Sequence, residues 1–163
     1  MTSPDSGSGM SALPIGGQAP DFSLRDQNNE VVTLSDFRGD RAVLLVFYPW
    51  AFTNICTGEL GQIRERLDEF ANDSVQVMSI SIDSSYAHKV FAQREDLQFP
   101  LLADFWPHGA VAQAYGVFNS EAGASNRGTF LIDRDGIIRF SEVNEIGVGR
   151  DPERWIQEIK ALS

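Results

Sequence analysis

The residue best suited to chemistry in this sequence is its single cysteine, Cys56, which follows an apolar run and precedes an amphipathic stretch. A strand that ends before the cysteine and a helix that begins there would place the thiol in the first helical turn. Unpaired backbone N–H groups and the positive end of the helix dipole favour the nucleophilic thiolate at that position. A lone cysteine can also be a small buried core residue. However, open α/β sheets place their sites at the carboxyl ends of strands, so we predict a reactive Cys56.

Two residues upstream of Cys56 support this prediction. Thr53 precedes the cysteine by three residues, about one helical turn, so its hydroxyl is expected to reach the sulfur. There it would hydrogen-bond a thiolate or orient an oxygen-containing substrate. Thr53 is also suited to capping the helix, and the two roles are compatible. Pro49 fixes the backbone and has no N–H, so it either shields a reactive sulfur or simply ends the strand.

The elements expected to position these residues are a buried strand and an amphipathic helix. Residues 42–48 read AVLLVFY, a continuous apolar run that is typical of a central strand buried on both faces. Across residues 55–72, apolar side chains recur at steps of three and four, which predicts a helix with one apolar face. Cys56 would then lie at the junction of the two elements.

Further elements are expected on both sides of this pair. They are an N-terminal hairpin (22–24 and 31–34), a strand (75–82), a helix (85–96), a strand (101–103), a short helix (109–115), a second hairpin (129–132 and 137–143) around an Asp-Gly turn, and a closing helix. The helix over 85–96 is expected to turn Tyr86, Val90 and Phe91 inward, and the closing helix, with Asp151 as cap and Pro152 at its first position, to bury Trp155, Ile156, Ile159 and Leu162. This alternation predicts an α/β fold with a mixed sheet and helices on both faces.

Length and charge narrow the class of protein. The chain has 163 residues, which fits a single domain, expected over residues 16–163. Residues 1–15 are rich in Ser, Gly and Pro and are expected to be a disordered extension or an expression remnant. The formal net charge of -10 disfavours nucleic acid and anionic membrane surfaces as partners. The longest apolar run, over residues 42–52, is too short to span a bilayer, which takes about 20 residues.

Cysteine and histidine content narrows the compartment and the chemistry. A single cysteine cannot form an intramolecular disulfide, and the polar first residues lack the apolar segment of a secretory signal. Both features favour a reducing cytoplasm. Cys56, His88 and His108 have no metal-ligand spacing, so neither a metal nor a cofactor is expected. His88 is expected to be an ordinary surface residue of its helix.

Pro49, Thr53 and Cys56 together reproduce a P-x-x-x-T-x-x-C signature, and with it the sequence resembles the peroxiredoxin family. The resemblance extends from about residue 16 to the C-terminus, through APDF at residues 19–22, FPLLAD at 99–104 and RGTFLID at 127–133. The stretch DFWPHGAV at 104–111 resembles the one-cysteine alkyl hydroperoxide reductase E group of actinobacteria. The family implies a thioredoxin-like α/β fold with a central mixed sheet, flanking helices and an N-terminal β-hairpin.

The resemblance also implies an activity and further site residues. Cys56 would attack hydrogen peroxide or an organic hydroperoxide and become a sulfenic acid, while water or an alcohol is released. Arg127 matches the family arginine that points at the cysteine, where a guanidinium would stabilise the thiolate and the developing charge on oxygen. Glu59 matches a position that is often acidic, where it would tether arginine hydrogen bonds. A solvated helix residue is the alternative for Glu59.

Partners follow from the same resemblance. With no second cysteine in the chain, an external thiol must resolve the sulfenic acid, and the expected reductant is mycothiol with a mycoredoxin or a thioredoxin-like protein. Related proteins commonly form homodimers or larger homo-oligomers. Trp50, Phe52 and Trp106 are candidates for the seam between subunits, or else core residues.

Other classes of function are less consistent with the residues. A thiol–disulfide oxidoreductase would need a second cysteine where Thr53 stands, and a cysteine hydrolase would need a histidine partner in a recognisable local pattern. The alternative that shares the first chemical step is a non-enzymatic peroxide sensor or relay, in which Cys56 passes its oxidation to a partner protein. Turnover with a reductant distinguishes the enzyme from the sensor.

Overall fold

A fully buried strand lies at the centre of the fold. The structure, a computed structural model, describes residues 13–162. β3 (Ala42–Phe47) is buried along its whole length and pairs in parallel with β4 (Val75–Ser81) and antiparallel with β8 (Arg127–Ile132). Its side chains alternate between two apolar clusters, one on each face of the sheet. The predicted central strand is therefore confirmed.

The other strands extend this core into one mixed sheet of seven strands, in the order β2-β1-β5-β4-β3-β8-β9. The outer strands are β1 (Ser23–Arg25), β2 (Val31–Thr33), β5 (Leu101–Ala103) and β9 (Ile138–Asn144). Both predicted hairpins are present, because β1 pairs antiparallel with β2, and β8 with β9. Gly136 in the second hairpin turn has a φ of 83°, which a residue with a side chain adopts at a cost.

Two short features were not predicted. They are the 3-10 helix η1 (Leu34–Phe37) and a small second sheet of β6 (Phe118–Asn119) and β7 (Ala124–Ser125). Each spans no more than four residues, which is too short to show a period in the sequence.

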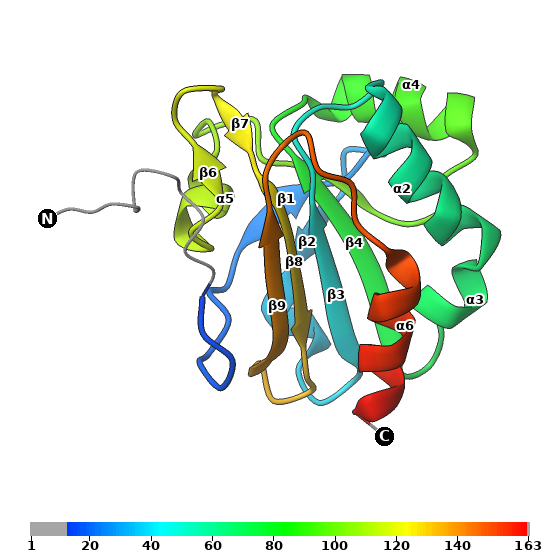
Figure 1. Cartoon of the computed structure of the whole chain (residues 1–163), viewed down its shortest axis with the longest axis vertical. Helices are drawn as coiled ribbons and strands as arrows, with labels where there is room; N and C mark the ends of the chain where they lie inside the picture. Colours follow the sequence, from blue (N-terminus) through cyan, green and yellow to red (C-terminus); the bar gives the residue numbers. More distant parts are fainter. Residues whose placement is uncertain (1–12, 163) are drawn as a thin grey trace, which may run out of the picture.

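Helices cover both faces of the sheet, as expected. The helices are α2 (Asn54–Glu65), α3 (Leu67–Phe70), α4 (Ser85–Glu95), α5 (Ala110–Ala114) and α6 (Pro152–Ala161). Residues of α2, α3, α4 and α6 join one apolar cluster, and residues of α5 and η1 join the other. Figure 1 shows α2, α3 and α6 along one side of the sheet and α5 with β6 and β7 on the other.

Several details of the predicted helices were wrong. The helix expected over residues 55–72 is interrupted at Arg66, whose φ of -129° and ψ of 39° separate α2 from α3. In α4, Tyr86 is 79% exposed and Val90 is also exposed, whereas His88 is fully buried, so the prediction of a surface histidine fails. The apolar residues of α4 are too few to fix its rotation, and the structure buries His88, Phe91 and Ala92 instead.

The two ends of the described chain are held against the sheet. Gly16 donates its N–H to the carbonyl of Ile138 at 2.8 Å, and Gln18 forms a β-bridge with Ile137. In α6, Asp151 caps the helix as predicted and Trp155 and Ile156 are buried, but Leu162 beyond its end is exposed. Residues 1–12 lie outside the described part, so the disordered extension over 1–15 stays a prediction. No helix within residues 13–162 has the length and apolar character needed to cross a membrane.

Candidate active site

Cys56 lies at the junction between the central strand β3 and the helix α2 that follows it. β3 ends at Phe47, the chain turns through residues 48–53, and α2 begins at Asn54 with Thr53 as its N-cap residue. The first helical hydrogen bond runs from the N–H of Thr57 to the carbonyl of Thr53 at 2.9 Å. Cys56 therefore lies in the first turn, where backbone N–H groups have no partner within the helix. Its side chain is fully buried.

Arg127 contacts the sulfur directly. It is the first residue of β8, and β8 runs antiparallel to β3, so the start of β8 lies at the edge where β3 ends. Its Nη1 donates to Sγ of Cys56 at 3.3 Å, and its Nε donates to the carbonyl of Ile146 at 2.7 Å. The arginine is only 2% exposed. The geometry therefore brings together the two residues, 71 positions apart, that the family resemblance paired.

Glu59 connects Arg127 to a second buried arginine that the sequence analysis missed. Oε1 of Glu59 accepts from Nη1 of Arg127 at 2.8 Å and from Nη2 of Arg150 at 2.9 Å. Oε2 accepts the backbone N–H of Arg150 at 2.8 Å and its Nε at 3.0 Å. Arg150 also donates to the carbonyl of Gly128 and to the hydroxyl of Thr129. Glu59 is buried, so the alternative of a solvated helix residue is not what the structure shows.

The buried cluster beside Cys56 carries more positive than negative charge. Arg127 and Arg150 carry two positive charges in the protein interior, and Glu59 supplies one negative charge between them. A buried charge without a counter-charge is costly. Because Nη1 of Arg127 contacts Sγ of Cys56, the uncompensated positive charge lies next to the sulfur. The cluster and the N-terminus of α2 thus both present positive charge to the sulfur.

Thr53 and Pro49 lie in the loop that leads into α2. The hydroxyl of Thr53 donates to the carbonyl of Trp50 at 3.0 Å rather than to the sulfur. Thr53 holds the N-cap position, but within the described chain its side chain makes no capping hydrogen bond. Because its single proton is used on Trp50, the oxygen of Thr53 can only accept a further hydrogen bond. Pro49 is buried beside the end of β3.

Arg150 could not have been found from spacing. It lies 94 residues beyond Cys56 in the chain and belongs to no local pattern other than the start of α6, where Asp151 caps the helix. The guanidinium of Arg150 also packs over an aromatic ring, 5.4 Å from the ring centre of Trp155. That contact is formed only once α6 packs against the sheet.

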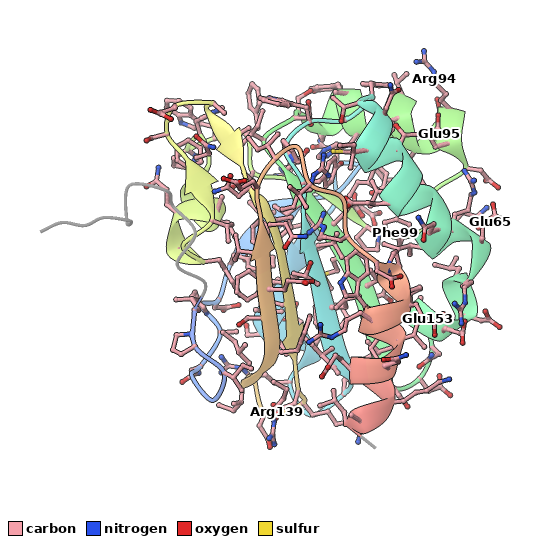
Figure 2. The ribbon with its side chains drawn as sticks, in the orientation of Figure 1. Glu65, Arg94, Glu95, Phe99, Arg139 and Glu153 are labelled. Carbon is pink, nitrogen blue, oxygen red and sulfur yellow. The ribbon has the colours of Figure 1, made fainter. Side chains whose placement is uncertain are left out.

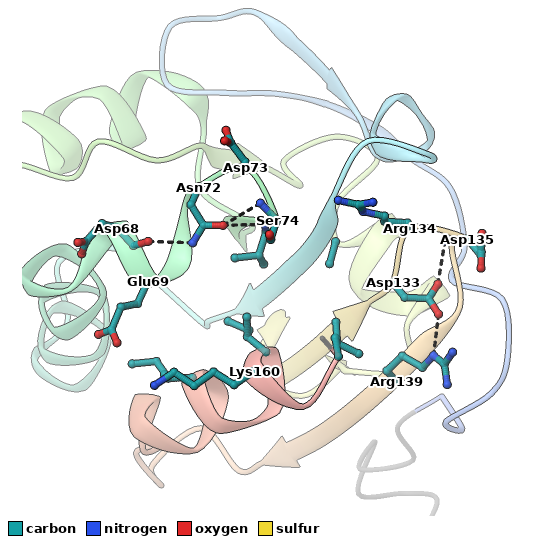
Figure 3. Close-up of a pocket in the computed structure, with 15 residues that line it drawn as sticks. Asp68, Glu69, Asn72, Asp73, Ser74, Asp133, Arg134, Asp135, Arg139 and Lys160 are labelled. Carbon is teal, nitrogen blue, oxygen red and sulfur yellow. Dashed lines mark hydrogen bonds and ion pairs between the residues drawn. The ribbon is translucent and has the colours of Figure 1, made fainter.

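A sizeable hollow in the described structure is remote from this cluster. It has a volume of about 840 Å³ and lies at the other end of β3, beside Ala42. Figure 3 shows Asp68, Glu69 and Asp73 on one side of it and residues of the β8–β9 turn on the other. Arg139 lines this hollow, whereas Arg94 contacts Phe52 in the loop before α2. Figure 2 shows these two arginines at opposite ends of the molecule, so the hollow and the cysteine cluster are well separated.

Metal chemistry has no visible site in the described part of the chain. Residues 13–162 contain no group of three or more His, Cys, Asp and Glu side chains placed to hold a metal ion. The reactive groups brought together in the cluster are a buried thiol, two guanidinium groups, one carboxylate and the first N–H groups of α2. This set is suited to nucleophilic attack by sulfur on a substrate whose leaving atom develops negative charge.

Comparisons with known proteins agree with this chemistry. Residues 15–141 match the model of the AhpC/TSA family. The chain is 54% identical over 151 residues to alkyl hydroperoxide reductase E of Mycobacterium tuberculosis, covering 93% of this chain and 99% of that protein. It is 33% identical over 158 residues to a chloroplastic 2-Cys peroxiredoxin of Hordeum vulgare, covering 91% of this chain and 74% of that protein.

The fold comparison gives the same family. The crystal structure of the reduced 2-Cys peroxiredoxin of Plasmodium vivax superposes with a TM-score of 0.82 at 28% identity, covering 92% of this chain and 82% of the other. The thioredoxin-like α/β fold that the sequence resemblance implied is thereby confirmed. The chain belongs to the AhpC/TSA family and is a peroxiredoxin of the alkyl hydroperoxide reductase E-like group.

Proposed function

We propose that this peroxiredoxin reduces hydrogen peroxide and organic hydroperoxides with Cys56 as its nucleophile. The observation that carries the proposal is the contact between Nη1 of Arg127 and the buried sulfur, at 3.3 Å, in the first turn of α2. A thiolate held there faces both a guanidinium and the helix N-terminus. Those groups can also receive the negative charge that develops on a peroxide oxygen.

The first step oxidises sulfur and splits the peroxide. The Cys56 thiolate attacks the terminal oxygen of the hydroperoxide, a sulfur–oxygen bond forms and the oxygen–oxygen bond breaks. The bonding electrons leave on the second oxygen, which takes up a proton and departs as water or an alcohol. Cys56 is left as a sulfenic acid.

Three groups hold the two oxygens in line for this step. Arg127 donates to the oxygens as charge grows on them, and the backbone N–H of Cys56, in the first turn of α2, donates to them as well. Thr53, whose proton is held by Trp50, accepts the hydrogen bond of the peroxide O–H. Pro49, buried just after β3, offers no N–H that could compete for the sulfur. Glu59 accepts a hydrogen bond from Arg127 and is itself held by Arg150, so the two residues fix the position of the Arg127 guanidinium.

The second half of the cycle needs a partner thiol, because Cys56 is the only cysteine in the chain. The external thiol attacks the sulfenic sulfur and water leaves, which gives a mixed disulfide. A second thiol then attacks the external sulfur of that disulfide and releases Cys56 reduced. We propose mycothiol with a mycoredoxin, or a thioredoxin-like protein, as the donor. Such a reductant fits a cytoplasmic location, where a lone thiol is kept reduced.

We further propose that the protein acts as a homodimer or larger homo-oligomer. Trp106 is 81% exposed and Phe105 beside it is exposed as well, while Phe52 in the active-site loop is 43% exposed. Exposed aromatic residues of this size are enriched in protein interfaces. Trp50, the third candidate for the seam, is half-buried.

The proposed function is tested by mixing the reduced protein with hydrogen peroxide and following tryptophan fluorescence by stopped flow. We expect a fast change, one added oxygen atom on Cys56 by intact mass, and no such change in Cys56→Ser. With a thiol donor present, the wild type should consume many equivalents of peroxide. A reaction as slow as that of an ordinary thiol, or continued peroxide consumption by Cys56→Ser, would contradict the proposal. A single oxidation without turnover would favour the sensor.

A further inference from the structure

The loop between β3 and α2 adopts an unfavourable backbone conformation. Phe52 has a φ of 71°, in the left-handed region that a bulky side chain rarely enters. Thr53 follows immediately, so the conformation of Phe52 helps to decide where the hydroxyl of Thr53 points. A strained residue of this kind persists only when its surroundings hold it. The residues that hold the loop therefore bear on the active site.

The holding contacts come from the segment that includes α4. The carboxylate Oδ2 of Asp83 accepts the backbone N–H of Ala51 at 2.8 Å. The ring of Phe52 packs against Phe91 with ring centres 5.0 Å apart, and the guanidinium of Arg94 lies 5.1 Å from the Phe52 ring centre. Because β3 and β4 are parallel, the loops after them meet at one edge of the sheet, and Figure 1 shows α2 and α4 at that end.

Asp83 is itself oriented by a buried pair. Ser81 donates its hydroxyl to the same Oδ2 of Asp83 at 2.6 Å, and Nε2 of His88 lies 2.7 Å from the hydroxyl oxygen of Ser81. Since a carboxylate only accepts, the proton of Ser81 goes to Asp83, and His88 donates to Ser81. Burial lowers the pKa of His88 to about 4, against an opposing effect of Asp83, so the imidazole is neutral at neutral pH.

A single peptide unit links Asp83 to Thr53. The peptide between Trp50 and Ala51 donates its N–H to Asp83 and accepts the hydroxyl of Thr53 on its C=O at 3.0 Å. The peptide is planar, so a partner that fixes the N–H also fixes the direction of the C=O. The proton of Thr53 is thereby held away from the sulfur, and the lone pairs of its oxygen are left free to accept.

We propose that Asp83 is a positioning residue for peroxide reduction, acting through the Trp50–Ala51 peptide on Thr53, with Ser81 and His88 setting the direction of its carboxylate. The proposal rests on the peroxidase function proposed above for Cys56. Asp83 touches neither the substrate nor the sulfur. Its effect is to present Thr53 as a hydrogen-bond acceptor for the peroxide before the substrate arrives.

The test compares variants at residue 83 in two reactions of the full chain. Asp83→Ala should lower the rate constant of Cys56 oxidation by hydrogen peroxide by about tenfold or more. Alkylation of Cys56 by iodoacetamide, which needs a thiolate but no oriented peroxide, should not fall. Asp83→Asn keeps an oxygen that can accept from both Ala51 and Ser81, so its peroxide rate should stay close to that of the wild type. Asp73→Ala, which removes an exposed carboxylate in the remote hollow, is the matched control.

A double-mutant cycle tests the route through Thr53. In a Thr53→Val background the acceptor is gone, so adding Asp83→Ala should cost little further peroxide rate. Independent, additive losses would overturn the proposal. If the Asp83→Ala variant does not fold, Ser81→Ala serves in its place, because it removes only the hydroxyl that orients the carboxylate. We expect a smaller loss of the peroxide rate in Ser81→Ala, again without a loss of the iodoacetamide rate. An unchanged peroxide rate in Ser81→Ala would then overturn it.

The outcomes separate this proposal from the proposed function. A fast wild type with an equally fast Asp83→Ala overturns the role of Asp83 and leaves the peroxidase function standing. Equal losses of the peroxide and iodoacetamide reactions in Asp83→Ala, without rescue by Asp83→Asn, show a merely structural residue and also overturn it. A wild type that reacts with peroxide no faster than an ordinary thiol overturns both.

Discussion

Arg150 donates hydrogen bonds to both carboxylate oxygens of Glu59, with Nη2 at 2.9 Å from Oε1 and Nε at 3.0 Å from Oε2, although the two residues are 91 positions apart. The same carboxylate holds Arg127, the arginine that contacts the sulfur. The orientation of Arg127 therefore depends on α2, which carries Glu59, and on the segment before α6, which carries Arg150. A guanidinium tied to two other elements is held ready for the reaction before any substrate binds.

Replacing Arg150 should affect both stability and rate. Arg150→Ala leaves Glu59 paired only with Arg127, and we expect the free energy of unfolding in urea to fall by about 3 kcal/mol, the low end for breaking a buried ion pair. The peroxide rate should fall too, because Arg127 loses its support. Arg154→Ala, at an exposed arginine of α6, should change the stability by less than about 1 kcal/mol. Equal stability of the two variants would show that the buried pair contributes nothing.

Arg127→Ala tests the contact with the sulfur. We expect the rate constant of Cys56 oxidation by hydrogen peroxide to fall about 100- to 1000-fold, the range for losing one preorganised donor to a developing oxyanion. Stopped-flow fluorescence measures this rate, and circular dichroism checks that the fold is retained. Arg127→Lys keeps the charge but lacks the planar guanidinium that reaches the sulfur, Glu59 and the carbonyl of Ile146 together, so its rate should lie between those of the wild type and Arg127→Ala. A peroxide rate unchanged in Arg127→Ala would remove this residue from the site.

Variants of Thr53 distinguish a role in binding the substrate from a role in capping α2. Because its hydroxyl donates to Trp50 and does not cap α2, Thr53→Val should leave the unfolding temperature nearly unchanged. The peroxide rate should fall about tenfold or more, since the substrate loses a hydrogen bond in the transition state. Thr53→Ser keeps the hydroxyl and should retain most of the rate. A large loss of stability with an unchanged rate would assign Thr53 to the helix instead.

The buried His88 should make stability depend on pH. Its pKa is about 4 in the folded protein against an ordinary value of 6.5, so between these values the unfolded chain binds a proton that the folded chain does not. Stability is therefore fully present above pH 6.5 and is lost as the pH falls toward 4. Urea unfolding at several pH values should show a shallower loss in His88→Gln than in the wild type. His108→Gln, at the other, exposed histidine, is the control and should follow the wild type.

The exposed aromatic residues give a test of assembly. If Trp106 lies in a subunit interface, Trp106→Lys should shift the protein toward monomer in sedimentation equilibrium, because a charge would be buried there. Val31→Lys, which places the same charge at another exposed apolar residue, should leave the mass unchanged. A wild type that is monomeric at all concentrations would contradict the proposed oligomer.

Much of the fold could be predicted because its elements repeat on a short scale. The run of apolar residues in β3 and the Asp-Gly turn between β8 and β9 show their structure within a few residues of the chain. Where a segment carried few apolar residues the prediction failed, as in α4, whose buried face holds a histidine. The break at Arg66 likewise left no local mark, because the apolar period continues through it.

The sequence by itself determined the nucleophile and its immediate setting. Cys56 and Thr53 lie one helical turn apart at a strand-to-helix junction, and such short-range relationships follow from helical geometry alone. Arg127 and Glu59 were assigned by resemblance to a family, since no spacing connects them with the cysteine. The contact of Arg127 with the sulfur, and its ion pair with Glu59, became visible only in the folded chain.

Only the tertiary structure decided what supports the site. Arg127 meets Glu59 because β8 runs antiparallel to β3 and its first residue returns to the edge where α2 begins. Arg150 reaches the same carboxylate from the segment between β9 and α6. Asp83 reaches the active-site loop because β4 runs parallel to β3 and ends at the same edge. These contacts join residues tens of positions apart, and the order and direction of strands is what brings them together. A periodic pattern reports on one element at a time, so it cannot show which ends will meet.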